Sequence, residues 1–539
     1  MTRTRALTGL AGAAALVAGI TVASRVAGFA RWFVQSFSVG ATSTGSVYNT
    51  ANLVPNVLFE IVAGGALASV VVPLLAGPLA RGLRADIDRI ASALLTWALA
   101  ALIPTAVLVA VFARPIVSRL MGSPVDQDLA RAQVDLGAHL LVVFAPQLVL
   151  YGIGIVLSGV LQAQQRFAWP AIMPLVSSLV VMGAYLMFRQ LADSAQADPA
   201  ALSSSAVAWL GWGTTAGVAA MSLPLLVPVH RSGVRLRPTW HFPAGVARRA
   251  ARLAMAGVGA LLAQQVAVVA VLRLSNGTGG PGTLSTFMYA QAVYVLPYAV
   301  LAVPLATVAF PRLAEHAATG DGQRYRRLVS LSTRSVIAVC AVGTAVLLAA
   351  APSVAAAFTA IDVGDIRGMA AALGWLAPGL IGYGLLLQSS RVLYALERGR
   401  SAVAAAAVGW LAVTLASILA VRALSGPAPD PPGTLLGLAI GNTVGTTLGG
   451  AAMLIAVRRA TGTGGSAGLV RNLVAAVAAG GLGAIAGRWI ADAGLAAWGR
   501  SLRGALPATC LSGVAALFVA GAVFAVLDRR TVAEVRRRA

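Results

Sequence analysis

Residues 9–36 read GLAGAAALVAGITVASRVAGFARWFVQS, and this stretch decides what kind of fold the chain has. It is longer than the roughly 20 mainly apolar residues that a helix needs to cross about 30 Å of hydrocarbon. Two arginines, Arg25 and Arg31, lie inside it. An arginine in the middle of a lipid-facing helix costs roughly 2.5–3.5 kcal/mol, so both side chains are expected to face protein, water or an anionic partner. The stretch therefore predicts a membrane span that borders a polar space.

Apolar segments of similar length recur along the whole chain. Of the 539 residues, 58% are hydrophobic and 11% are charged, and the mean hydropathy is +0.83, which is too apolar for a soluble protein. The predicted fold is an all-α polytopic membrane protein with about 14 transmembrane helices. The spans are expected near residues 9–36, 44–78, 88–113, 133–162, 168–189, 204–229, 247–273, 283–311, 326–350, 369–396, 401–422, 433–457, 468–491 and 504–527.

The charge distribution predicts the orientation of these spans. The formal charge of +23 is spread over many short loops and is not gathered on one basic face, so no nucleic-acid partner is expected. Arginines concentrate in alternate breaks between spans, and most loop aspartates lie in the other breaks. By the positive-inside rule, both termini are cytoplasmic. The start MTRTR resembles a secretory signal, but the apolar helix continues through Trp32 and Phe33, which predicts an uncleaved first span.

Two pairs of short segments indicate an internal duplication. ASVVVPLLA at residues 68–76 resembles ATVAFPRLA at 306–314, and VLQAQQR at 160–166 resembles VLYALER at 392–398, at offsets of 238 and 232. Six spans separate the members of each pair, so the two halves have the same orientation. We expect a lobe over 1–230, a second lobe over 231–460, and two further helices with a short basic tail over 461–539. Two parallel six-helix lobes predict alternating access to a central substrate site.

Four polar residues of the second span share one helical face. Asn49, Asn52, Asn56 and Glu60 are separated by three, four and four residues. A single intramembrane asparagine is usually only a contact between helices, worth about 0.6 kcal/mol. Four such residues in register, ending in a carboxylate, favour a hydrophilic cavity.

The two arginines of the first span fit a phosphate ligand. Guanidinium groups bind phosphate through two parallel hydrogen bonds, which a lysine ammonium does less well, so a substrate with a pyrophosphate group is predicted. Arg25 and Arg31 diverge by about 120° on a straight helix, although Gly28 between them could permit a bend. In the alternative interpretation, Arg25 pairs with Glu60 or with backbone carbonyls, and Arg31 extends to the membrane interface.

Nothing in the sequence indicates an enzyme, a cofactor or a metal site. Cys340 and Cys510 have neither disulfide nor metal-ligand spacing, and the motifs of metalloproteases, P-loop proteins and serine hydrolases are absent. Asp86-Ile87-Asp88 has the DxD form of sugar-nucleotide transferases, but its arginine neighbours favour a solvated loop. The second lobe contributes scattered polar residues, each more often a packing contact: Gln264, Gln265, Gln291, Tyr294, Gln388, Ser389 and Arg391.

The first two spans also resemble a known family. SRVAGFAR at 24–31 and VPN at 54–56, leading to GGAL at 64–67 and VPLL at 72–75, are similar to the MurJ (MviN) lipid II flippases. The resemblance extends over all fourteen spans, and this chain looks similar to actinobacterial members of the family. That family belongs to the multidrug/oligosaccharidyl-lipid/polysaccharide exporter superfamily, with paired six-helix lobes, and adds two C-terminal helices thought to form a groove for the lipid tail.

The resemblance implies a function and a substrate. Lipid II, a polyprenyl-pyrophosphate glycolipid, would be moved from the inner to the outer leaflet of the plasma membrane for peptidoglycan assembly, and membrane lipids and cell-wall synthesis proteins are the other expected partners. Two alternatives remain: export of another polyprenyl-linked glycan or of a drug, and a non-transporting scaffold for cell-wall synthesis.

The resemblance also bears on the candidate site. Arg25 and Arg31 match the family's first-span pair. Phe59-Glu60 stands where well-studied members carry an arginine, and Gln291-Ala292 stands where they carry an Asp-Arg pair, so pyrophosphate contact would rest on the two arginines. The candidate substrate-binding residues are Ser24, Arg25, Arg31, Asn49, Asn52, Asn56, Glu60, Gln291 and Gln388.

Overall fold

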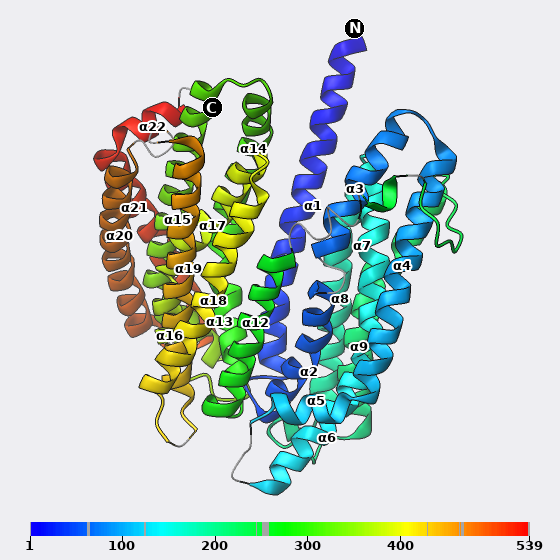
Figure 1. The fold of residues 1–539 in the computed structure, drawn as a ribbon. Coiled ribbons are helices and arrows are strands. Elements are labelled where there is room, and N and C mark those ends of the chain that lie inside the picture. Colours follow the sequence, from blue (N-terminus) through cyan, green and yellow to red (C-terminus); the bar gives the residue numbers. More distant parts are fainter. Residues whose placement is uncertain are drawn as a thin grey trace. The chain divides into compact units, whose positions relative to one another are not determined.

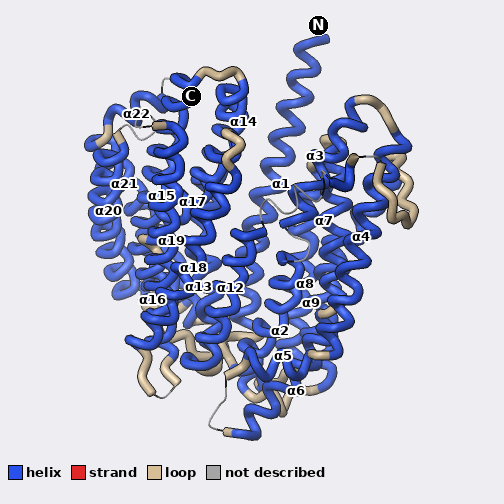
Figure 2. The backbone as a smooth tube through the Cα atoms, in the orientation of Figure 1, coloured by secondary structure: helices blue, strands red, loops and turns tan. Residues whose placement is uncertain are grey.

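The structure is a computed structural model that describes residues 2–61, 65–122, 126–243, 245–248, 250, 258–427, 429–462, 464 and 468–536. Within these residues the fold consists of helices and connecting loops and contains no strand (Figure 1, Figure 2). The all-α prediction is therefore confirmed. Contacts divide the chain into two units, residues 1–261 and residues 262–539. The predicted lobe boundaries after residues 230 and 460 stay predictions.

Unit 1 is a bundle in which helix starts follow the expected caps. The Thr42 hydroxyl accepts the Gly45 N–H, the Asp126 carboxylate accepts two N–H groups, and the Ser203 hydroxyl accepts the Ala206 N–H. Each side chain satisfies backbone donors that a helix start leaves unpaired. The elements are α1 (Thr2–Ser38), α2 (Ser43–Phe59), α3 (Gly65–Ala80), α4 (Arg84–Val111), α5 (Ala113–Leu120), α6 (Gln127–Phe144), α7 (Pro146–Ala163), α8 (Ala168–Leu191), η2 (Ala195–Ala197), α9 (Ser204–Ser222), η3 (Leu223–Leu225) and α10 (Leu226–Arg231).

Unit 2 contains α15, the longest helix among the described residues, and α20 and α21 pack beside it (Figure 1). Two of its segments, η4 and η5, are short π-helical turns. The elements from the unit boundary onward are α12 (Val258–Leu274), η4 (Ser275–Gly279), α13 (Thr283–Pro297), η5 (Tyr298–Ala302), α14 (Val303–Ala318), α15 (Gly322–Thr359), α16 (Met369–Leu376), α17 (Gly379–Ala395), α18 (Gly399–Leu424), α19 (Pro431–Thr461), α20 (Leu469–Trp498), α21 (Leu502–Leu527) and α22 (Arg529–Arg536).

The helices account for most of the predicted membrane spans. Among the described residues, 11 helices or continuous helix pairs are long and apolar enough to cross a membrane, or 12 if α16 and α17, bent by 46°, form one span. These correspond in order to the third through the fourteenth predicted spans. The first two predicted spans coincide with α1 and with α2 and α3, which are helical but are not among the 12. The count of fourteen is thus not confirmed.

Small residues let α18 and α19 pack closely against each other in unit 2. Gly437, Gly441, Gly445 and Gly449 recur every four residues on one face of α19, against a matching face of α18. A Cβ atom at Gly409 of α18 would lie 2.8 Å from the Gly449 Cα, so the backbones approach without room for a side chain. In lipid, where burial between apolar side chains gains little, such close contact supplies van der Waals attraction.

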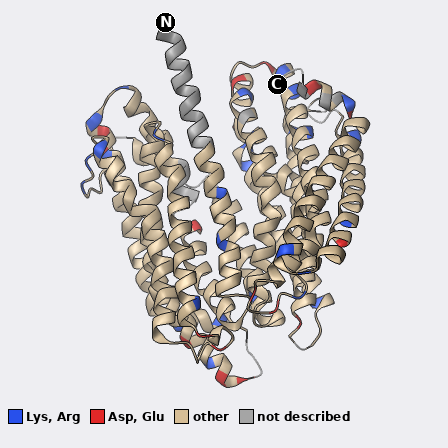
Figure 3. Ribbon diagram, turned by 180° about the vertical axis from the view of Figure 1, so that it is seen from behind, with Lys and Arg blue, Asp and Glu red and all other residues tan. Residues whose placement is uncertain are grey.

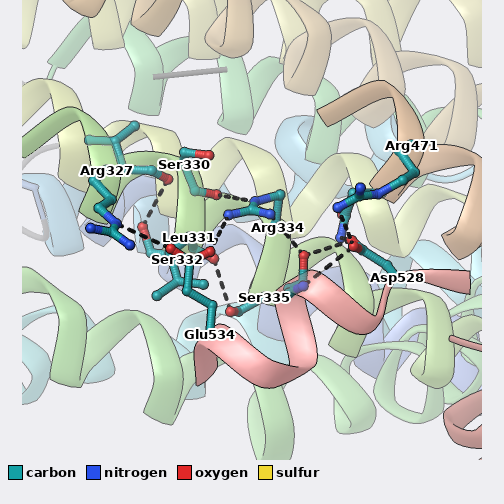
Figure 4. A network of polar contacts seen from close by, with 12 residues as sticks. Arg327, Ser330, Leu331, Ser332, Arg334, Ser335, Arg471, Asp528 and Glu534 are labelled. Atoms are coloured by element: carbon teal, nitrogen blue, oxygen red, sulfur yellow. Dashed lines mark hydrogen bonds and ion pairs between the residues drawn. The ribbon is translucent and has the colours of Figure 1, made fainter. Parts of the chain in front are cut away.

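Polar contacts fasten the C-terminal helix α22 to the rest of unit 2 (Figure 4). The fully buried Asp528 carboxylate accepts hydrogen bonds from Arg471 Nη2 at 2.7 Å, Asn472 Nδ2 at 2.9 Å and Thr531 Oγ1 at 2.6 Å. Glu534 forms ion pairs with Arg327 and Arg334 at 3.2 and 2.9 Å. These contacts join α15, α20 and α22 at one end of the unit. They are charge-assisted, and charge-assisted hydrogen bonds are the stronger kind.

Candidate functional site

Charged side chains are sparse along the helices and gather towards their ends (Figure 3). This is the distribution expected for spans in lipid, because a charge at membrane depth is expensive unless it faces protein or water. Arg25 and Arg31 are exceptions, since both lie well inside α1. They are therefore the natural starting point for a site.

The structure leaves Arg25 exposed and Arg31 half-buried. Helix α1 is continuous from Thr2 to Ser38, so it passes through Gly28 without a break. Neither arginine forms an ion pair with Glu60 or with any other carboxylate in the described part of the chain. The alternative in which Arg25 is neutralised by Glu60 is thus not observed. Glu60 itself is half-buried at the C-terminal end of α2.

Helices α1, α2 and α7 bring a cluster of polar side chains together. The Asn56 amide donates to the Asn52 carbonyl at 2.7 Å and also interacts with the Tyr151 hydroxyl. Arg31 is close enough for its charge to act on the same hydroxyl. The Phe59 ring packs against the Tyr151 ring, with centroids 5.2 Å apart. An amide and a phenol in contact can donate hydrogen bonds to an anionic oxygen, and the positive charge of Arg31 favours an anion there.

Asn49 belongs to a different, buried network. The Gln35 side chain donates to Asn49 Oδ1 at 2.9 Å. The Tyr48 hydroxyl lies 2.8 Å from that of Tyr185 and 3.0 Å from Thr214 Oγ1. All these side chains lie inside unit 1, and their hydrogen bonds satisfy one another, as buried polar groups require. Asn49 therefore differs from Asn52 and Asn56, which are half-buried.

The remaining candidate residues occupy separate places. The Ser24 hydroxyl donates to the Ala171 carbonyl at 2.9 Å and so joins α1 to α8. In unit 2, Gln388 of α17 is buried and donates to Ser332 Oγ at 3.0 Å. Gln291 of α13 is half-buried. The assignment of these residues to a substrate site stays a prediction.

Sequence reasoning singled out Tyr294 but missed Tyr151, Tyr298 and Tyr383, which the fold brings close to other tyrosines or to polar groups. Tyr151 joins the Arg31 and Asn56 cluster in unit 1. In unit 2 the ring centroids of Tyr298 and Tyr383 lie 5.0 Å apart, and those of Tyr294 and Tyr383 lie 6.3 Å apart. The available signal was scarcity, because only nine tyrosines occur in the chain. A tyrosine inside an apolar span carries a hydroxyl that needs a partner.

Asp88 of the Asp86-Ile87-Asp88 motif has a backbone partner. Asp88 Oδ1 accepts the backbone N–H of Arg235 at 3.0 Å. The described residues contain no group of three or more histidine, cysteine or acidic side chains that could hold a metal ion.

Long apolar helices in two units, with arginine and amide side chains placed inside them, define a multi-pass membrane protein by class. The fold agrees with that of a solved structure titled "Lipid II flippase MurJ, inward closed conformation", with a TM-score of 0.70 and 16% identity, covering 96% of this chain and 99% of that one. It also agrees with an inward-facing multidrug resistance MATE family transporter of the MOP superfamily, with a TM-score of 0.64 and 13% identity, covering 82% and 94%.

The particular family follows from the sequence. The family model described as "Lipid II flippase MurJ" matches residues 36–501, and the chain belongs to that family. A relative from Rhizobium tropici, named "Probable lipid II flippase MurJ", is 26% identical over 323 residues. That alignment covers 59% of this chain and 57% of the relative's length. A multi-span protein of a flippase family belongs in the plasma membrane.

Proposed function

We propose that this protein is a lipid II flippase, which moves the undecaprenyl-pyrophosphate-linked peptidoglycan precursor from the inner to the outer leaflet by alternating access. The family match over residues 36–501 carries the proposal. The relative's name and the similarity of the fold to a MurJ structure support it. Transport requires no catalytic group, so we propose that the protein is not an enzyme and needs no cofactor.

The proposed binding site centres on Arg25 and Arg31. Their guanidinium groups would bind the pyrophosphate, which is the most strongly charged part of the substrate. Asn52, Asn56 and Glu60 would contact the polar headgroup. Gln291, which belongs to unit 2, stays a predicted substrate contact. The hydrogen bonds of Ser24, Asn49 and Gln388 favour a supporting role, in which they hold α1, α2 and α17 in place. Helices α20 and α21 would guide the polyprenyl tail.

We further propose that both termini lie in the cytoplasm. Among the described residues of unit 1, one end of the helices carries Arg81, Arg84 and Arg231. The opposite end carries Asp126, which precedes α6, and Asp198, which follows η2. The positive-inside rule then assigns the arginine-rich end to the cytoplasm. Cell-wall synthesis proteins are the expected partners.

The direct test is transport by the full chain in vesicles. Fluorescent lipid II is placed in both leaflets, and a membrane-impermeant quencher reports how fast the protected fraction becomes accessible. A hydrogen bond to a charged group contributes about 1.5–3 kcal/mol, so Arg25→Ala or Arg31→Ala is expected to slow transport at limiting substrate by roughly 10- to 150-fold. Arg119→Ala on α5, an exposed arginine of the same unit, is the matched control. Equal rates for all variants would refute the proposed site.

A second candidate function is export of another polyprenyl-linked glycan or of a drug, which the similarity to a multidrug transporter favours. Unlabelled competitors separate the two. We expect lipid II, but not a cationic drug, to compete with the fluorescent substrate. A scaffold without transport activity would leave the quenching rate at that of empty vesicles.

A further inference from the structure

The segment that follows α10 is bound along the surface of α4. Residues 234–243, called the linker segment below, have no regular secondary structure. Asp88 Oδ1 accepts the N–H of Arg235 at 3.0 Å, Ser92 Oγ accepts the N–H of Arg237 at 3.0 Å, and Thr96 Oγ1 accepts the N–H of Thr239 at 3.1 Å. The backbone of the linker segment is therefore held by a row of α4 side chains.

The spacing of that row explains its regularity. Asp88, Ser92 and Thr96 are four residues apart, so they lie on one face of α4. In an extended chain, every second residue presents its N–H group in the same direction. The three side-chain acceptors of α4 therefore bind the N–H groups of Arg235, Arg237 and Thr239. Extended backbone near lipid needs such partners, because no water supplies them deeper in the membrane. The linker segment thus has a fixed path on unit 1.

A cavity of about 360 Å³ lies where the linker segment meets the start of α4. Three arginines line it, Arg89 from α4 and Arg235 and Arg237 from the linker segment. All three are exposed, and none of them forms an ion pair among the described residues. Asp88 is the one carboxylate among the lining residues, so three positive charges face one negative charge. The cavity has a net positive charge and open guanidinium groups.

Two tryptophans place this cavity at the membrane surface. Trp97 and Trp240 are 51% and 55% exposed, and their rings meet edge to face with centroids 5.2 Å apart. Trp97 Nε1 also donates to the Trp240 carbonyl at 3.1 Å. Exposed tryptophans in membrane proteins concentrate at the boundary between headgroups and hydrocarbon. Trp97 follows Asp88 by nine residues, or roughly 13 Å along the helix, which puts the arginines at headgroup level.

We propose that this cavity binds the phosphate of an anionic phospholipid, with Arg89, Arg235 and Arg237 holding the headgroup and Trp97 and Trp240 contacting the adjoining acyl chains. Guanidinium forks suit phosphate oxygens, and basic pockets beside membrane helices are suited to anionic headgroups. A lipid bound there bridges α4 and the linker segment. Membrane lipid thereby stabilises the path of the chain from α10 towards unit 2, which is separate from transport of a substrate.

The test uses the full chain in nanodiscs of phosphatidylcholine with or without phosphatidylglycerol. Native mass spectrometry measures retained lipid, and hydrogen exchange measures protection of the 234–243 amides. Each arginine near an anionic surface contributes roughly fivefold to binding, so Arg89→Gln/Arg235→Gln/Arg237→Gln is expected to lower phosphatidylglycerol affinity by up to about a hundredfold. The matched control is Arg81→Gln/Arg84→Gln/Arg231→Gln, which removes three exposed arginines at the same end of unit 1 outside the cavity.

The proposal is supported if phosphatidylglycerol protects the linker segment in the wild type and in the control but not in the cavity variant. Equal retention by the cavity variant and the wild type overturns it, and so does equal loss in both triple variants. Inorganic phosphate is the second probe: if it protects residues 234–243 as well as the lipid does, the ligand is a free anion and the lipid assignment is wrong. If the glutamine variant does not fold, the lysine variant Arg89→Lys/Arg235→Lys/Arg237→Lys replaces it, because it keeps the three positive charges. Unchanged retention of phosphatidylglycerol by the lysine variant refutes recognition of the phosphate by guanidinium forks.

Discussion

The attachment of α22 gives the sharpest prediction of local stability. Asp528→Ala removes a fully buried carboxylate that accepts hydrogen bonds from Arg471, Asn472 and Thr531. Asn472 is also fully buried, so its amide would lose the partner it has. A buried donor left unsatisfied costs about 1–3 kcal/mol, and each hydrogen bond to a charged group contributes about 1.5–3 kcal/mol.

These contributions do not simply add. The Arg471 side chain is 42% exposed, so it can turn to water and its share is small. We therefore expect Asp528→Ala to weaken the attachment of α22 by about 2–4 kcal/mol, which is roughly a 30- to 1000-fold increase in local opening. Hydrogen exchange of the α22 backbone amides, followed by mass spectrometry in detergent, measures this opening directly. The rest of unit 2 should keep its protection.

Asp492→Ala is the matched control. Asp492 pairs with Arg488 at 2.9 Å one turn away on α20, but the two side chains are 55% and 52% exposed. An exposed pair of this kind contributes about 0.3–0.5 kcal/mol, so exchange of α22 should not change. Asp528→Asn keeps the shape of the side chain but not its charge, so its rate of α22 amide exchange should fall between those of Asp528→Ala and Asp492→Ala. If the α22 amides are as well protected in the Asp528→Ala variant as in the Asp492→Ala variant, the buried Asp528 carboxylate does not stabilise the attachment of α22.

Three further predictions concern pH, packing and the buried network. Burial alone would raise the pKa values of Asp528 and Glu534, but hydrogen bonds from Thr531 and Arg334, among others, hold both below their ordinary values. Their stabilisation is therefore present at neutral pH and lost as the pH falls below about 4, which α22 exchange at stepped pH will show. Gly441→Ala should destabilise by about 1–3 kcal/mol, because a Cβ there overlaps the Ser417 backbone, whereas Gly481→Ala meets open space and should be neutral or stabilising in thermal unfolding. Tyr48→Phe leaves the Tyr185 and Thr214 hydroxyls without their shared partner and should lower stability by about 1–2 kcal/mol.

The sequence predicts the spans well because hydropathy is a property of each segment by itself. Eleven predicted spans, or twelve with the bent pair α16 and α17, correspond to long apolar helices in the described residues, and the family expected from short motifs in the first two spans agrees with the family match over residues 36–501. The face carrying Asn49, Asn52 and Asn56 is a weaker guide, because helical periodicity does not say which neighbour covers each residue. Gln35 covers Asn49, while Asn52 and Asn56 stay half-buried.

Contacts between distant residues are the part that sequence patterns do not predict. The pairing of Asp528 with Arg471 joins residues 57 positions apart, and the linker segment meets α4 across more than 140 positions. Neither Asp528 nor Arg471 stands out in its own segment, since an aspartate after an apolar helix and an arginine in the first turn of one are both common at membrane surfaces. By contrast, the four-residue repeat of glycines from Gly437 to Gly449 is visible in the sequence and predicts the close packing of α19.

The two arginines of α1 differ in what each can do, and this difference can be tested. Seven residues separate Ser24 from Arg31, about two helical turns, so both side chains lie on nearly the same face of a straight α1. Ser24 fixes that face against α8, and Arg31 lies where its charge acts on Tyr151. Arg25 is displaced by about 100° from Ser24 and is exposed. We therefore expect Arg31→Gln to lower the thermal stability of unit 1 as well as transport, whereas Arg25→Gln should lower transport alone. Equal thermal stability of the two variants would mean that Arg31 has no structural role beyond substrate binding.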